Sequence, residues 1–160
     1  GSCINNGKKT SVCKAGIGVH FPSSNSIVIK DISKPCYVKK GNPTNNIAEL
    51  RAIYEALYNI NDIVKEGNPH KITNINIYSD SEYSIKIFNK TNKYQSNKVL
   101  IESIFHMMSI LKDSGIDITY IHVKAHTSEP CDSLLHNIWY GNKMADKLAT
   151  EASNKSSKIL

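Results

Sequence analysis

The sequence lacks long apolar runs. None approaches the roughly 20 residues that a membrane-spanning helix requires. The first residues also show neither the basic region nor the apolar region of a signal peptide. We therefore expect no membrane partner and an intracellular location, either cytoplasmic or nuclear.

Cysteine is scarce and scattered. The four cysteines are Cys3, Cys13, Cys36 and Cys131, and no two of them form a Cys-x-x-Cys pair. This spacing disfavours both a zinc site and the dense disulfide framework of a small secreted domain. We expect reduced thiols.

Acidic residues are outnumbered by basic ones. Lysine and arginine total 20 against 14 acidic residues, which gives a net charge of +6 and favours a polyanionic partner. A chain of 160 residues that is 40% hydrophobic fits one compact domain. We place a monomeric domain over residues 1–152 and a frayed tail over residues 153–160.

Hydrophobic periodicity predicts alternating strands and helices. Apolar residues alternate with polar ones where we expect strands, and recur every three or four residues where we expect helices. The expected order is strands at 15–21 and 27–32, a helix over 47–60 capped by Thr44 or Asn45, a strand at 72–79, a short helix at 81–88, a helix over 100–111 that stops at Gly115, a strand at 118–123 and a helix from Asn142 to Ala152. This order predicts an α/β fold in which helices cover the faces of a mixed sheet.

Three acids fall where this layout brings strand ends and helix starts together. Glu49 lies in the first turns of a helix, Asp80 ends a strand, and Asp146 lies near the start of the last helix. Carboxylate oxygens are the ligands that Mg²⁺ prefers in proteins. Taken singly, each acid is better interpreted as a solvated surface charge.

Five short motifs in register distinguish these interpretations. They are GSCINNG with AGIGV at the start, TNNIAEL around Glu49, YSDS around Asp80, HVKAHT around His126, and GNKMADKLA around Asp146. In this order, and across almost the whole chain, the sequence resembles the type 1 ribonuclease H family. The resemblance implies a ribonuclease H-like α/β fold, with a mixed five-stranded sheet flanked by helices.

The same resemblance implies a metal site. Glu49, Asp80 and Asp146 match three of the family's four metal-binding carboxylates, which hold two Mg²⁺ ions, with Mn²⁺ as an alternative. The fourth is an Asp at the end of the first strand, directly before the position of Gly1, so we expect that strand and its Asp to be missing here. Gly1 and Ser2 are either a vector scar or the start of a fragment; we favour the fragment, because Gly-Ser-Cys matches the family's loop.

His126 resembles the family's mobile active-site histidine, which assists proton transfer or product release. A side chain with a pKa near neutrality suits that role. We interpret the remaining histidines as ordinary loop or packing residues: His20, His70, His106, His122 and His136. The connection after His126 includes Trp139 and Tyr140, for which packing is the simpler role and base stacking the alternative.

Recognition of an RNA/DNA hybrid is the partner interaction that the resemblance implies. Asn6, Asn45 and Asn46 match positions that contact 2′-hydroxyls, with the backbone around Cys3 assisting; turn and cap chemistry is the alternative for each Asn. The remaining matches concern the DNA strand: Thr44 and Asn97 in a phosphate pocket, and Tyr83 against a sugar. Asn42 stands where some relatives have an Arg, and the segment after Phe88 is too short for a basic protrusion.

The resulting hypothesis is a ribonuclease H that cuts the RNA strand of hybrids and leaves 5′-phosphate and 3′-hydroxyl ends. Two alternatives stay open: the ribonuclease H domain of a reverse transcriptase, and a hybrid-binding module that has lost catalysis. A proofreading exonuclease of the same broad fold fits less well, because such enzymes use an Asp-x-Glu pair on the first strand.

Overall fold

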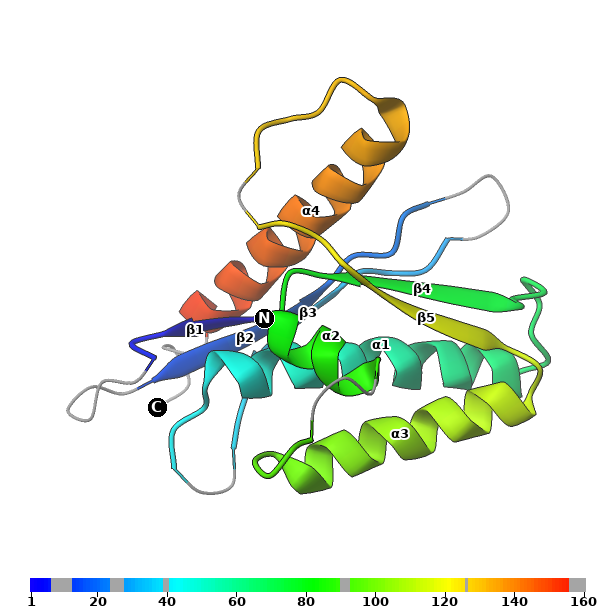
Figure 1. The fold of residues 1–160 in the computed structure, drawn as a ribbon, viewed down its shortest axis with the longest axis horizontal. Helices are drawn as coiled ribbons and strands as arrows, with labels where there is room; N and C mark the ends of the chain where they lie inside the picture. Colours follow the sequence, from blue (N-terminus) through cyan, green and yellow to red (C-terminus); the bar gives the residue numbers. More distant parts are fainter. Residues whose placement is uncertain (7–12, 24–27, 39–40, 90–92, 126, 156–160) are drawn as a thin grey trace.

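The chain folds around two groups of strands (Figure 1). The computed structural model describes residues 1–6, 13–23, 28–38, 41–89, 93–125 and 127–155. Its element order is β1 Ser2–Ile4, β2 Lys14–Val19, β3 Ile32–Cys36, α1 Asn45–Lys65, β4 Asn74–Ser79, α2 Glu82–Phe88, α3 Lys98–Asp113, β5 Asp117–His122 and α4 Ser133–Lys155. This is the expected mixed α/β architecture, and the four helices lie against the strands.

The strands form two hydrogen-bonded sets within the described residues. β1, β2 and β3 pair antiparallel in that order, whereas β4 and β5 pair in parallel, from Asn74 with Asp117 to Ser79 with His122. The expected strand over 72–79 is thus confirmed, and its alternating burial follows its alternating sequence. Because β4 and β5 are parallel, Asp80 follows β4 at the same end of the pair at which β5 finishes.

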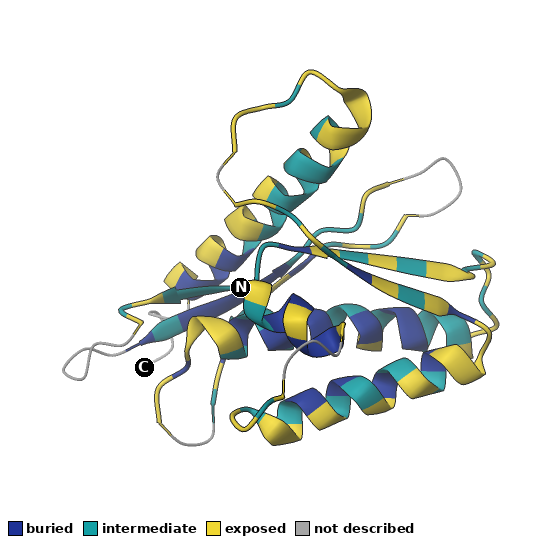
Figure 2. Cartoon of the chain, in the orientation of Figure 1, coloured by how far each residue is buried: buried dark blue, intermediate teal, exposed yellow. Residues whose placement is uncertain are grey.

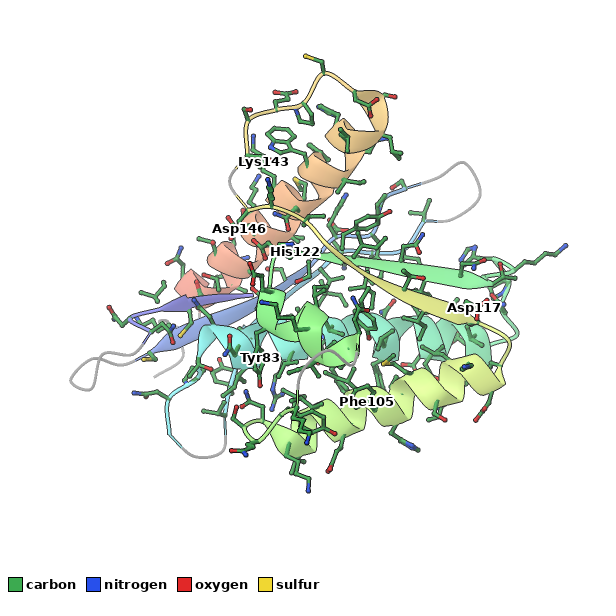
Figure 3. The ribbon with its side chains drawn as sticks, viewed as in Figure 1. Tyr83, Phe105, Asp117, His122, Lys143 and Asp146 are labelled. Atoms are coloured by element: carbon green, nitrogen blue, oxygen red, sulfur yellow. The ribbon has the colours of Figure 1, made fainter. Side chains whose placement is uncertain are left out.

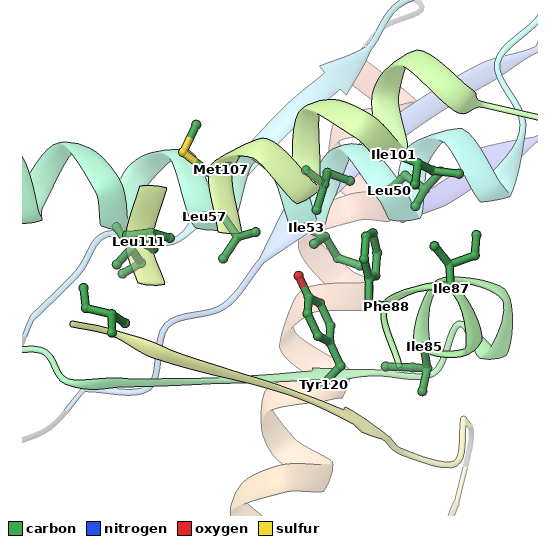
Figure 4. Packing of buried hydrophobic residues seen from close by; sticks show 13 residues of the cluster. Leu50, Ile53, Leu57, Ile85, Ile87, Phe88, Ile101, Met107, Leu111 and Tyr120 are labelled. Atoms are coloured by element: carbon green, nitrogen blue, oxygen red, sulfur yellow. The ribbon is translucent and has the colours of Figure 1, made fainter. Parts of the chain in front are cut away.

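Helix α1 forms because Thr44 caps it and apolar residues recur along it. The Thr44 hydroxyl accepts a hydrogen bond from the Ile47 amide at 3.3 Å, as expected of an N-cap. One face of α1 packs with α2, α3 and β5 in a core of large side chains that includes Leu50, Leu57 and Phe88 (Figure 4). The helices predicted over 81–88 and 100–111 are also confirmed, as α2 and α3.

The other face of α1 packs on β2, in a layer of smaller residues. Ala15 and Ile17 of β2 point toward Ala48 and Ala52 of α1. Side chains alternate along a strand, so Gly16 and Gly18 point the opposite way, toward α4. The sheet of β1 to β3 therefore lies between α1 and α4.

The expected bounds of the third strand were wrong. The strand placed at 27–32 begins instead at Ile32, because Val19 pairs with Ile32 and the Asp31 carboxylate accepts from the Phe21 amide at 2.9 Å before the ladder starts. Pro35 is tolerated in β3 because β3 is an edge strand of its set.

The last helix is much longer than expected. α4 begins at Ser133, nine residues before Asn142, so much of the presumed loop after His126 is helical. It also continues to Lys155, with Ser153 buried, so the tail begins later than residue 153. At the other end of the chain, Ser2–Ile4 forms a short strand where a loop was expected. The four cysteines are free thiols, as predicted.

Candidate active site

Three acids from three separate elements line one cavity. Glu49 comes from α1, Asp80 follows β4, and Asp146 lies on α4; all three border a cavity of about 630 Å³ between the two sets of strands. Figure 3 shows Asp146 on the part of α4 that passes the strands. The structure thus brings together the three carboxylates that the sequence singled out.

The pKa of Glu49 is shifted by its burial and by the charged groups around it. Burial raises the pKa of the Glu49 carboxyl above its ordinary value, and the negative charges of Asp80 and Asp146 raise it further. The amine of Gly1 lies 2.7 Å from Glu49 Oε1 and acts in the opposite direction, lowering that pKa. Because like charges repel in a partly enclosed site, the cavity favours a cation beside Glu49.

The donor set fits a divalent ion in its chemistry. Each of the three side chains offers the hard oxygen ligands that Mg²⁺ and Mn²⁺ take. Across the described residues, however, no three His, Cys, Asp or Glu side chains are spaced closely enough to form a metal cluster. The donors that would hold an ion are Glu49, Asp80 and Asp146.

Local structure fixes the position of Asp80. The Ser79 hydroxyl accepts from the Ser81 amide at 3.1 Å, and the Ser79 carbonyl accepts from the Val123 amide at 3.0 Å. Ser81 then caps α2 by accepting from the Ser84 amide at 3.3 Å. Asp80 is therefore held between a strand end and a helix start, which ties it to β5 as well as to β4.

Close backbone packing fixes the position of Asp146. A Cβ atom at Gly18 would collide with the carbonyl oxygen of Ala145, and one at Gly16 with that of Ala149. Only glycine allows α4 to approach β2 so closely. Asp146 follows Ala145 in the sequence, so this contact sets its distance from the strands.

The residues expected to contact substrate near α1 are gathered at its start. The Cys3 thiol donates to the Pro43 carbonyl at 3.2 Å, which ties β1 to the segment before the helix. Thr44, Asn45 and Asn46 are exposed there. Asn6 is also exposed, in the turn after β1, whereas His126 lies outside the described residues.

The structure also brings Tyr83 and Asn97 together. The Asn97 side-chain amide donates to the Tyr83 hydroxyl at 3.3 Å, which connects the start of α3 to α2. Asn97 adopts a left-handed backbone conformation, with φ of 58°, at the residue before α3. Both side chains are half-buried, and neither lines the cavity that holds the three acids.

One further residue of the cavity has a partner that the sequence did not indicate. His20, interpreted as an ordinary loop histidine, donates from Nδ1 to Asp31 Oδ2 at 2.9 Å and borders the same cavity as the three acids. Its ring meets the edge of the Tyr140 ring, with centroids 6.0 Å apart. No local pattern links residues 20 and 31, because their contact depends on the register between β2 and β3.

The relatives of this chain are ribonucleases H. A family model described as RNase H matches residues 1–154. Ribonuclease H from Caldanaerobacter subterraneus is 30% identical over 141 residues, covering 82% of this chain and 80% of that protein. Ribonuclease H from Saccharomyces cerevisiae is 37% identical over 100 residues, covering 62% of this chain but 26% of that protein. Human Ribonuclease H1 is 26% identical over 165 residues, covering 98% of this chain and 49% of that protein.

Solved structures share the fold. LC11-RNase H1, isolated from compost, matches with a TM-score of 0.61 at 20% identity and covers 89% of this chain and 86% of that one. The prototype foamy virus protease-reverse transcriptase matches with a TM-score of 0.58 at 22% identity, over 92% of this chain and 20% of that one.

No helix in the described part of the chain is both long and apolar enough to cross a membrane. With three acids in one cavity and a family model that spans nearly its whole length, the chain belongs to the ribonuclease H family.

Proposed function

We propose that this chain hydrolyses the RNA strand of RNA/DNA hybrids as an endonuclease, leaving 5′-phosphate and 3′-hydroxyl ends. One observation carries the proposal: in a chain of the ribonuclease H family, Glu49, Asp80 and Asp146 converge on a single cavity from three elements. The chain spans about half of the length of the human relative and about a quarter of the yeast relative.

The three carboxylates would hold two divalent ions, Mg²⁺ or Mn²⁺. When bound, such ions would supply Lewis-acid chemistry at the phosphate that is cut. Glu49, Asp80 and Asp146 would orient the ions, and the repulsion among the three carboxylates would be relieved by the cations. We assign to His126 the transfer of a proton near the leaving group, in keeping with its residue type.

Substrate choice is proposed to depend on amides. Asn45 and Asn46, exposed in the first turn of α1, and Asn6, exposed after β1, offer donors and acceptors for 2′-hydroxyls, with the backbone at Cys3 beside them. For the DNA strand, Thr44 and Asn97 are the proposed phosphate contacts and Tyr83 the proposed sugar contact. The hydrogen bond between Tyr83 and Asn97 supports a shared role for these two.

The test is cleavage of a labelled hybrid by the chain extended before Gly1 with a short apolar strand ending in Asp, and by Asp80→Asn in the same extended chain. We expect cleavage with Mg²⁺ to fall roughly 100- to 1,000-fold, because one charged ligand is lost, while hybrid binding is retained. Asp117→Asn is the matched control, since Asp117 is exposed at the opposite end of the β4–β5 pair. Near-normal turnover by Asp80→Asn contradicts the assignment.

Substrate specificity is a separate test. The wild type should cut the hybrid but neither duplex DNA nor single-stranded RNA, because only the hybrid combines 2′-hydroxyls on one strand with a deformable DNA strand. Asn45→Ala should weaken hybrid cleavage without creating DNA cleavage. Comparable rates on duplex DNA would refute the proposal.

A second candidate is hybrid binding without cleavage. It is favoured by one observation, that the described side chains include no three-ligand metal cluster. Three proteins separate cleavage from binding alone: the chain that begins at Gly1, the chain extended before Gly1 by a short apolar strand ending in Asp, and the same extension ending in Asn. Cleavage that needs the added Asp supports the enzyme with a fourth carboxylate, whereas binding without cleavage in all three versions supports the binding module.

A further inference from the structure

The half of α4 that precedes Asp146 does not belong to the core. The buried residues of α4 are Ala149, Ala152 and Ser153, all beyond Asp146. None of residues 133–145, every one of which the structure describes, is buried. In Figure 2 this half of the helix extends away from the strands and is coloured exposed or intermediate along its length. Its side chains are therefore available for a partner.

One face of this half carries aromatic and basic side chains that lead to the acidic site. His136, Trp139, Tyr140 and Lys143 recur at three- and four-residue intervals, and Asp146 follows three residues later. We name these four residues the α4 stripe. Residues at this spacing share one face of a helix, and ten residues of helix span about 15 Å. The stripe is therefore a continuous strip that ends at a proposed metal ligand.

The side chains of the stripe hold one another in place. Lys143 Nζ lies 4.6 Å from the centre of the Trp139 ring, and the Trp139 Nε1–H donates to the Thr127 carbonyl at 2.9 Å. The His136 ring lies 5.6 Å from the Trp139 ring and 6.4 Å from the Tyr140 ring, nearly parallel to the latter. Side chains that are already ordered lose little freedom when a ligand binds.

The chemistry of the stripe matches a nucleic-acid strand. Tyr140 is exposed, whereas His136 and Trp139 are half-buried. Accessible aromatic rings stack on bases of any sequence, and neighbouring cations attract the phosphates. Lys143 and, one turn further, Lys147 are exposed. Two acids lie at the far end: Glu129 Oε1 is 2.9 Å from His136 Nε2, and Asp132 Oδ1 accepts from the Leu135 amide at 2.9 Å.

We propose that the α4 stripe binds the RNA strand to one side of the phosphate that is cut. The inference rests on the proposed function, since the strand whose phosphate lies at Asp146 is the one that continues along the same helix face. It gives α4 a substrate-binding role and compensates for the basic protrusion that the short segment after Phe88 cannot supply. Leu134 and Leu135, 66% and 55% exposed, lie before the stripe and are not needed by it.

Trp139 makes a direct test available, because it is the only tryptophan in the sequence. A short RNA/DNA hybrid with a labelled RNA strand is titrated with the full chain in buffer containing EDTA, which stops cleavage. We expect tryptophan fluorescence to change and to saturate together with the anisotropy of the label. Binding by anisotropy without any change in tryptophan fluorescence overturns the stripe while leaving the proposed function intact. If the hybrid is neither bound in this buffer nor cut with Mg²⁺, the proposed function fails, and the stripe with it.

Matched substitutions make the test quantitative. Tyr140→Ala should weaken hybrid binding roughly 5- to 100-fold, the range for loss of one stacked base, and Tyr140→Phe should restore it. Lys143→Gln should reduce the slope of log affinity against log salt by about one. Tyr58→Ala on α1 and Lys112→Gln on α3 make the same changes on exposed residues elsewhere and should leave binding unchanged.

Cleavage kinetics separate a binding role from a merely structural one. The stripe variants should raise KM and leave kcat near the wild-type value, with unchanged thermal midpoints. Binding and KM equal to those of the two control variants contradict the proposal, and this half of α4 would then serve another partner, such as a protein bound at the exposed leucines.

Discussion

The two faces of α1 pack in different ways. On one face, large side chains such as Leu50, Ile53 and Leu57 pack against those of α2, α3 and β5. On the other, alanines meet β2, and beyond β2 the backbone of α4 rests directly on Gly16 and Gly18. The first region stabilises the chain through buried area, whereas the second sets the distance between elements. The acidic cavity depends on the second, because α4 carries Asp146.

The largest effect is expected at the glycine contact. Gly18→Ala places a methyl group against the backbone of Ala145 and Ala149, neither of which can rotate away. We expect the free energy of unfolding to fall by more than about 4 kcal/mol, in the tail of single-substitution effects, and hybrid cleavage to be lost as α4 shifts. Chemical denaturation and cleavage assays measure both.

Gly141→Ala is the matched control for this prediction. Gly141 lies inside α4, and an added Cβ would meet only the His20 ring carbon Cδ2, at 3.7 Å. Alanine is favoured over glycine inside a helix by about 1 kcal/mol, so this variant should be more stable than the wild type. If the two glycine variants have the same free energy of unfolding, the close contact at Gly18 does not control the packing of α4.

A smaller effect is expected in the core of large side chains. Leu57 is fully buried and does not border the acidic cavity, so Leu57→Ala should lower the free energy of unfolding by about 3 kcal/mol. Cleavage per folded molecule should stay near the wild-type value at temperatures where the variant is folded. A loss of kcat larger than the loss of folded protein would show that the two regions are coupled.

The same core contains a buried hydroxyl, that of Tyr120, whose removal should stabilise the folded chain. The Tyr120 hydroxyl is buried and has no hydrogen-bond partner in the described structure, and burial raises the pKa of Tyr120 (Figure 4). Tyr120→Phe should therefore raise the free energy of unfolding by about 1 kcal/mol. A destabilised Phe variant would indicate that the hydroxyl is hydrogen-bonded in solution.

The smallest effect concerns pH. The pKa of Glu49 is raised in the folded chain above its ordinary value of 4.5, so the folded state holds the proton more tightly than the unfolded state. Stability contributed by Glu49 is then present at low pH and decreases as pH rises through 4.5 to the raised pKa. In EDTA, Glu49→Gln should be slightly more stable than the wild type at pH 7, although inactive.

This pH dependence should disappear at low pH. Below pH 4.5 the wild-type carboxyl is protonated in both states, and the two proteins should unfold at the same denaturant concentration. A wild type that instead gains stability over Glu49→Gln between pH 4 and 7 would mean that the ion pair with the Gly1 amine outweighs burial.

Elements with strong periodicity could be predicted from the sequence. The apolar positions from Ile47 to Ile60, the alternation in β4 and the cap at Thr44 are local properties, because each depends on residues within one or two turns. The order of the surrounding motifs also singled out the three acids that line the cavity, and their role as metal ligands stays a prediction. The start of β3 was not, because it follows from pairing with β2 and from the bond between Asp31 and Phe21.

The sequence by itself determined which residues form α1, α3 and β4 and which acids to examine, since hydrophobic period and capping act over a few residues. Only the tertiary structure decided that Gly18 admits α4 against β2 and that His20 joins the acidic cavity through Asp31. Those features depend on contacts between residues that are separated by 11 to more than 100 positions in the sequence. Such contacts produce no periodic pattern that sequence analysis could detect. The α4 stripe depends on both the sequence and the tertiary structure. Its three- and four-residue spacing is visible in the sequence, whereas its exposure beside Asp146 follows from how α4 packs.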